Sequence, residues 1–427
     1  MNRKFIFLTI IGFVLVIGFT QLAFARWFTS KTVEFLRDVP TVTPLSTTHA
    51  WRWSEKLKEA EDILSKISLS VSSTERIYQE SVFSAQSFPN RHLVTQHDRD
   101  REIALAVLEV KTGDIRTVII QKKGADLIAP EDFPISIIER SNGIRWNKWN
   151  TQYQAPEGYV VIKNSYPDLT GITERKVLKD RRGRTYVTYV PKVEYFIYTP
   201  YSEAIHDPEL VSLGREYLQD VVRQSFVQLD TYRIPSLAFQ GQTIGEAGIL
   251  KPEYFQLLPL IEQTDMTEFI LDPQKTSERV LVLIGSNASH AFEKTGSPAG
   301  ALGWVQYTKK TYDAIRRTYP KAGLIPDFTM GAADHKNSML AAVLLYDYNL
   351  AHFIKKSGNQ IIQDERLEEY LAAAYNGGPV RINQSLQASI LARDRDWLGG
   401  LLNETQGYIV KLRALHSMDI MQIADRQ

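Results

Sequence analysis

The pattern of hydrophobic and polar positions divides the chain into four stretches. The first is the uncharged run Phe5–Ala25, which follows two basic residues and is long enough to span a bilayer. We expect residues 1–26 to form either a retained membrane anchor or a cleaved signal peptide, because Ala23-Phe24-Ala25 also fits a small-x-small cleavage site. Both alternatives place the bulk of the chain outside the cytoplasm.

The second stretch contains one clear amphipathic helix. Leu57, Ala60 and Leu64 recur at helical spacing with charged residues between them, which predicts a helix near 54–68. The residues after it are polar and their pattern is ambiguous. We expect 27–100 to be a helical, membrane-proximal region in which a second helix pairs with the first.

A two-residue period replaces the helical one from about residue 103. Runs rich in β-branched residues flank a turn at Lys111–Asp114, and a second pair of runs flanks Gly183. Asp207 followed by Pro208 is a helix start. We therefore expect 101–235 to be an α+β domain with antiparallel strands, closed by this helix.

The last stretch, 245–427, has helical spacing almost throughout. Pro259 should kink or restart a helix near its beginning. Another helix should stop at Asn376–Pro379, which places Tyr375 and Asn376 at a helix end where their side chains can face a cleft. The whole chain is thus expected to belong to the α+β class.

Composition removes several kinds of chemistry. The chain has 427 residues, a formal net charge of +1 and no cysteine, so it lacks disulfides, thiolate metal sites and a cysteine nucleophile. Neutral charge gives no reason to expect nucleic acid as a partner. The eight histidines show no His-Glu-x-x-His spacing, and we expect neither a metal site nor a cofactor.

Two motifs carry a resemblance to a known family. The segment "SPAGALGWVQYTKKTY", starting at Ser297, and the segment "AAAYNGGP", ending at Pro379, resemble the goose-type lysozyme and soluble lytic transglycosylase family in order, type and approximate spacing. The resemblance covers roughly 250–400. It implies an all-α lysozyme-like C-terminal domain in which both segments line a peptidoglycan cleft. The substrate-binding residues implied are Ser297, Gly300, Gly303, Gln306, Tyr375 and Asn376.

The position of the catalytic acid is open. In the family a single Glu stands about nine residues before the first motif, but Ala288 occupies that place here. A second alignment matches "PEYFQLLPLIEQ" to the family's opening helix and makes Glu262 the catalytic residue, beside apolar Leu260 and Ile261. The remaining alternatives are three other acids or no catalytic acid at all; those acids are Glu293, Glu268 and Glu246.

The resemblance predicts a membrane-anchored peptidoglycan lytic transglycosylase of the bacterial cell envelope, cleaving the MurNAc–GlcNAc bond. A single Glu would act as acid and then as base, in place of the usual carboxylate pair. The alternative is a non-catalytic peptidoglycan-binding protein or envelope scaffold. Expected partners are peptidoglycan glycan strands, the membrane through the N-terminal helix, and an envelope protein bound by the middle domain.

Overall fold

A computed structural model describes residues 50–427 except 83–89, 124–125, 140, 180–182, 184, 393–395 and 423–427. The described residues belong to one compact unit. The expected α+β class is confirmed as a β-sheet followed by a helical C-terminal region. The apolar run Phe5–Ala25 lies outside the described residues, and within them no helix is both long and apolar enough to cross a membrane.

One antiparallel sheet of six strands dominates the first half of the described chain. Its strands are β1 (Val71–Val82), β2 (Asn90–Glu109), β3 (Ile115–Lys123), β4 (Asp126–Ile128), β7 (Tyr159–Lys179) and β8 (Thr185–Tyr198). The order is β4-β3-β2-β7-β8, with β1 on β2. Two short strands, β5 (Ser136–Ile137) and β6 (Tyr153–Gln154), pair separately. The expected turn between β2 and β3 is confirmed. The strands on either side of Gly183, β7 and β8, pair antiparallel as expected, and most of the turn that joins them lies outside the described residues.

The prediction of a helical region through residue 100 is wrong after the first helix. Residues 71–82 and 90–101 form β1 and the first half of β2, paired over their whole length. The second half of β2 pairs with β3 on one side and with β7 on the other. Where β7 leaves β2, the buried Arg101 donates from Nη1 to the Pro167 carbonyl at 2.9 Å. The sequence did not reveal these strands because 71–82 and 90–101 are polar and lack a regular alternation of apolar and polar residues.

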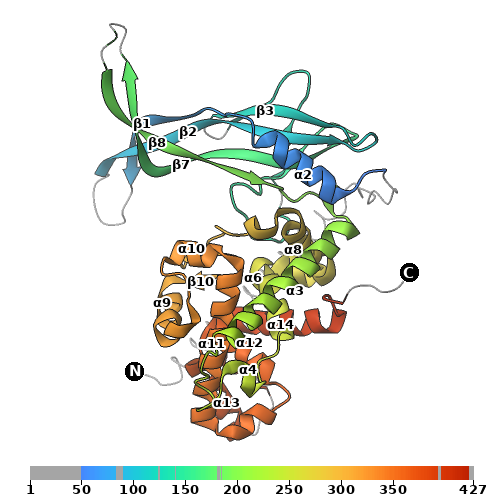
Figure 1. Ribbon diagram of the computed structural model, residues 1–427, viewed down its shortest axis with the longest axis vertical. Coiled ribbons are helices and arrows are strands. Elements are labelled where there is room, and N and C mark those ends of the chain that lie inside the picture. The colour runs from blue at the N-terminus through green and yellow to red at the C-terminus, as the bar shows by residue number, and fades with distance from the viewer. Residues whose placement is uncertain are drawn as a thin grey trace, which may run out of the picture. The chain divides into compact units, whose positions relative to one another are not determined.

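The helix α2 (Trp53–Leu64) packs on the half of the sheet formed by β2, β3 and β7 (Figure 1). Its buried residues follow the predicted stripe and include Leu57, Ala60 and Leu64. Glu209 accepts hydrogen bonds from the backbone N–H groups of Trp53 and Ser54, both at 3.1 Å. Glu209 therefore caps the first turn of α2 from another helix.

That second helix, α3 (Pro208–Thr231), begins as predicted: Asp207 accepts a hydrogen bond from the Glu209 N–H at 2.8 Å. It does not simply close the sheet domain, however. It packs on α8 (Pro273–Asn287) and α11 (His335–Ser357) of the helical region. A Cβ on Gly214 would lie 2.1 Å from the Leu281 carbonyl oxygen, and one on Gly285 would lie 2.1 Å from that of Leu210. This close backbone contact attaches α3 to the helical region.

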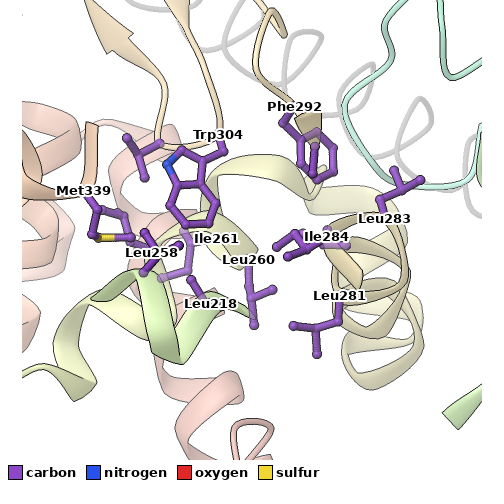
Figure 2. Packing of buried hydrophobic residues seen from close by; sticks show 14 of the residues in the cluster. Leu218, Leu258, Leu260, Ile261, Leu281, Leu283, Ile284, Phe292, Trp304 and Met339 are labelled. Atoms are coloured by element: carbon purple, nitrogen blue, oxygen red, sulfur yellow. The ribbon is translucent and has the colours of Figure 1, made fainter. Parts of the chain in front are cut away.

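The helical region holds the largest part of the core. Its helices are α4 (Ile244–Ala247), α5 (Glu253–Gln256), α6 (Leu258–Gln263), α7 (Met266–Leu271), α8 (Pro273–Asn287), α9 (Lys309–Thr318), α10 (Phe328–Ala333), α11 (His335–Ser357), α12 (Leu367–Gly377), α13 (Pro379–Ala392) and α14 (Asn403–Met418), with one small hairpin of β9 (Ala301–Leu302) and β10 (Tyr307–Thr308). Figure 2 shows Leu258, Leu260 and Ile261 of α6 packed near Leu281 and Ile284 of α8 and near Trp304. Because α6 is fixed by these apolar contacts, the polar residues at its end have a defined place.

Candidate functional site

The end of α6 is attached directly to the first sequence motif. Pro259 restarts the helix as predicted, since α5 ends at Gln256 and α6 begins at Leu258. At the other end of α6 the buried Gln263 donates from Nε2 to the carbonyls of Gly303 and Trp304, at 3.2 and 2.7 Å. The residue before it, Glu262, therefore lies beside the segment that resembles a glycan cleft.

Glu262 is partly buried among three tyrosines. Tyr408 of α14 faces its carboxyl, and the electrostatic influence of Glu262 also reaches Tyr375 of α12 and Tyr346 of α11. Burial raises the pKa of Glu262 from 4.5 to about 7. The positive charges of Arg145 and Lys411 and the Tyr408 hydroxyl oppose this increase but do not cancel it.

Two cations satisfy the last carbonyl groups of α6. The Arg145 Nε donates to the Glu262 carbonyl at 2.8 Å, and the buried Lys411 donates to the Ile261 carbonyl at 2.9 Å and to that of Thr264. Cations at a helix C-terminus complement its partial negative charge. Burial lowers the pKa of Lys411 to about 8. The same side chains thus hold the helix end and influence its carboxyl group.

Tyr375 connects the two motifs. Its hydroxyl donates to the Val305 carbonyl at 2.6 Å, and its ring contacts Tyr307 and Tyr346 with centroid separations of 5.8 and 5.9 Å. The expected helix stop is confirmed, because α12 ends at Gly377 and α13 begins at Pro379. The two segments that carry the family resemblance are therefore in contact, and Glu262 lies beside them.

Gln306 is held by the backbone of its own segment. It adopts a left-handed conformation at φ 53°, which is uncommon for a residue other than glycine. Its Nε2 donates to the Thr295 and Gly303 carbonyls at 3.0 and 2.7 Å. Its Oε1 is buried and has no hydrogen-bond partner in the described part of the chain. The amide nitrogen is thus used inside the segment and the amide oxygen is buried, so the expected contact of Gln306 with a sugar stays a prediction.

Ser297 and Gly300 form a tight turn before β9. The Ser297 N–H donates to the Ala301 carbonyl at 2.9 Å, its Oγ accepts from the Ala301 N–H at 3.1 Å, and the Gly300 N–H donates to the Ser297 carbonyl at 2.9 Å. Gly300 is exposed at φ +78°, with open space where a Cβ would stand. Its expected contact with a glycan stays a prediction.

Gly303 has a different reason to be small. It lies at φ +79°, and a Cβ there would stand 2.1 Å from the Ala332 carbonyl oxygen of α10. We expected this glycine to admit a sugar ring. Internal packing already requires a glycine at this position, so the residue type is no evidence for a ligand.

Asn376 is attached to α14 as well as to α12. Its Oδ1 accepts a hydrogen bond from Thr405 Oγ1 at 2.7 Å, and its Nδ2 lies 3.5 Å from Glu404 Oε1. Glu404 in turn raises the pKa of Glu262 by its negative charge. Asn376 therefore fixes a neighbour of the candidate acid.

The other candidate acids have partners away from this cluster. Glu293 pairs with His290 at 3.2 Å, and Glu268 pairs with Arg279 at 3.5 Å. Glu246 closes a capping box with Thr243 and pairs with Arg233; these hydrogen bonds lower its pKa, which is the wrong direction for an acid.

Comparisons of the chain with protein-family models, curated proteins and solved structures find no match.

Ala288, at the spacing where the family has its acid, is exposed at the end of α8 with φ 47°. The residue before it, Asn287, is bonded to the sheet: its Oδ1 accepts from the Thr199 N–H at 2.7 Å, and its Nδ2 donates to the Thr199 carbonyl at 3.0 Å. The end of α8 is thus used to join the sheet to the helical region.

Sequence reasoning missed Arg145, Tyr408 and Lys411. The last two stand three residues apart on α14, the spacing that places side chains on one face of a helix. That spacing was visible, but nothing local connects it to Glu262. Arg145 lies 117 residues before Glu262, in the loop between β5 and β6. Its role depends on the docking of that loop.

Proposed function

We propose that this chain is a lytic transglycosylase that cleaves the MurNAc–GlcNAc bond of peptidoglycan with Glu262 as its only catalytic carboxyl group. The observation that supports this most is the position of Glu262, with its raised pKa, beside Tyr375 and beside the segment bound by Gln263. The proposal identifies 245–427 as a lysozyme-like domain. It also takes 1–26 as the segment that attaches the protein to the membrane of a bacterial cell envelope.

The chemistry requires one group to act twice. As an acid, Glu262 protonates the glycosidic oxygen while the bond to the anomeric carbon breaks. As a carboxylate, it then accepts the proton of the substrate's own 6-hydroxyl, whose oxygen bonds to the anomeric carbon and closes a 1,6-anhydro ring. No water is consumed. The proton returns to Glu262, so the group ends the cycle as it began.

A pKa of about 7 suits both steps. At neutral pH roughly half of the molecules carry the proton that the first step needs. An ordinary surface Glu would carry it in fewer than about one molecule in a hundred. Partial burial among Tyr346, Tyr375 and Tyr408 provides this shift without a second carboxylate as nucleophile.

The decisive test compares the full-length protein, purified in detergent, with Glu262→Gln on isolated sacculi. We expect mass spectrometry to find anhydro-muropeptides with the wild type, reduced at least about 100-fold in the variant, because a general acid contributes factors of this size. Glu293→Gln is the matched control, since Glu293 pairs with the exposed His290, and it should keep wild-type activity.

Other products would change the conclusion. Anhydro products that persist in Glu262→Gln would assign the acid to another residue. Reducing-end products would indicate a hydrolase. Sacculi that bind the wild-type protein but release nothing would favour a non-catalytic glycan-binding protein.

A further inference from the structure

We infer that Trp146 is a second contact for the glycan strand, a flat surface on which a hexosamine ring stacks outside the position held at Glu262. This inference rests on the proposed function, because it takes the ligand of the site to be a glycan. Trp146 belongs to the loop between β5 and β6, outside the region of family resemblance. It would be a binding residue that the sheet domain contributes to the helical domain's site.

The loop is docked on the end of α6. Ile144 forms an isolated antiparallel bridge with Thr264, the Asp265 N–H donates to the Gly143 carbonyl at 2.8 Å, and the Arg145 N–H donates to the Gln263 carbonyl at 2.8 Å. A Cβ on Gly143 would lie 2.3 Å from the Glu268 Cβ, so the loop approaches α7 closely. The backbone beside Trp146 is therefore fixed against the helix end that carries Glu262.

The residues before and after Trp146 contact two different parts of the candidate site. Arg145 donates from Nε to the Glu262 carbonyl, and Asn147 lies on the other side, with its Nδ2 3.4 Å from Thr295 Oγ1. Thr295 accepts the hydrogen bond from Gln306 through its carbonyl. The loop at Trp146 is thus attached on one side to Glu262 and on the other to the segment that contains Gln306.

The Trp146 side chain itself is left in solvent. It is 68% exposed, whereas Trp149 three residues later is 5% exposed and stacks on Phe196 with a centroid separation of 4.4 Å. Trp146 is the only exposed tryptophan among the described residues. An indole exposed beside the candidate site offers a ligand an apolar face and an N–H donor.

A glycan strand fits this surface better than a compact ligand does. One face of a pyranose ring consists of C–H groups and packs on an indole ring, while the hydroxyls at the ring's edge stay hydrated. A polymer cleaved at Glu262 has further sugar rings on both sides of the bond that is cut. An exposed indole on a loop docked beside Glu262 offers one of them a stacking surface.

The test compares Trp146→Ala and Trp146→Phe in the full-length protein with Tyr232→Ala as control. Tyr232 is 50% exposed at the end of α3 and is no part of the proposed site. On purified glycan strands we expect Trp146→Ala to raise KM about tenfold and to change kcat less than twofold. Trp146→Phe should recover most of the loss, and the control should match the wild type.

A binding measurement separates this inference from the proposed function. Calorimetry with hexa-N-acetylchitohexaose on Glu262→Gln should show about tenfold weaker binding when Trp146→Ala is added. If no variant cleaves glycan but this loss of affinity remains, the proposed function fails and the Trp146 contact stands. If Glu262-dependent cleavage is found and Trp146→Ala has wild-type KM and affinity, the contact is refuted alone.

Discussion

Two helices of the same compact body, α6 and α8, end close to the segment that carries the first motif, and they end in opposite ways. At the end of α8, the Asn287 side chain hydrogen-bonds to both the backbone N–H and the backbone carbonyl of the buried Thr199. The next residue, Ala288, is exposed. At the end of α6, Glu262 has a carboxyl group whose burial disfavours its charge. The first arrangement stabilises the fold, whereas the second works against it.

This difference separates the two positions that the sequence offers for the acid, Ala288 after α8 and Glu262 in α6. Counting back from Ser297 leads to α8, because α8 precedes the motif in the chain. The neighbours of the motif in space are different, since Gln263 of α6 binds its carbonyls and Tyr375 binds Val305. Strained electrostatics in an otherwise well-paired region is typical of functional sites. On that ground we propose that α6, rather than α8, carries the acid.

The largest expected effect concerns an attempt to move the acid. Ala288→Glu, added to Glu262→Gln, restores the family's usual spacing. We expect it to recover less than about 1% of the wild-type yield of anhydro-muropeptides, because residue 288 is exposed and is not among the tyrosines that surround Glu262. Product analysis by mass spectrometry checks this. Substantial recovery would reverse the comparison and make α8 the catalytic helix.

A smaller but still large effect is expected at the structural end. Asn287→Ala leaves the buried N–H and carbonyl of Thr199 without partners and should lower the free energy of unfolding by about 2–4 kcal/mol. Urea denaturation followed by circular dichroism measures the change. Asn359→Ala, at an exposed position in η4 (Asn359–Gln363), is the control and should stay within about 0.5 kcal/mol of wild type. Equal stability of the two variants would contradict the role given to α8.

Much of the local structure could be predicted from the sequence. The turn at Lys111–Asp114, the start of α3 after Asp207, the break at Pro259 and the stop at Gly377 follow from residues whose backbone preferences act locally. The apolar stripe of α3 was also visible. The stripe shows that a helix is packed on one face, but it does not identify the packing partners, which in the structure include α8 and α11.

The site itself could be predicted only in part. The motifs led to Tyr375, Gln306 and, through its apolar flank, Glu262. They could not lead to Arg145, because no local pattern connects residues that lie 117 positions apart. They also suggested that Gly303 is a glycine in order to admit a sugar ring, but its close packing against the Ala332 carbonyl already requires a glycine there. Contacts that depend on tertiary docking were the part beyond reach.

The smallest expected effect is a change in the free energy of unfolding that has opposite signs for variants at the two helix ends. The folded-state pKa of Glu262 is raised from 4.5 to about 7, so its ionisation costs stability as the pH rises through that range. Below about pH 4.5 the group is protonated in both states and costs nothing. At pH 8 this pKa difference corresponds to a loss of about 3 kcal/mol in the free energy of unfolding. Because the side chain is partly exposed, we expect a loss of about 2 kcal/mol.

Glu262→Gln removes this cost, because glutamine does not ionise in either state. The variant should therefore be more stable than wild type by about 2 kcal/mol at pH 8 and about equal to it at pH 4.5, in contrast to the loss expected for Asn287→Ala. Urea denaturation at both pH values measures the difference. A gain of the same size at both would show that the carboxyl group is not strained by burial. Because the measurement needs no substrate, it tests the site's electrostatics even if the reaction proves to be a different one.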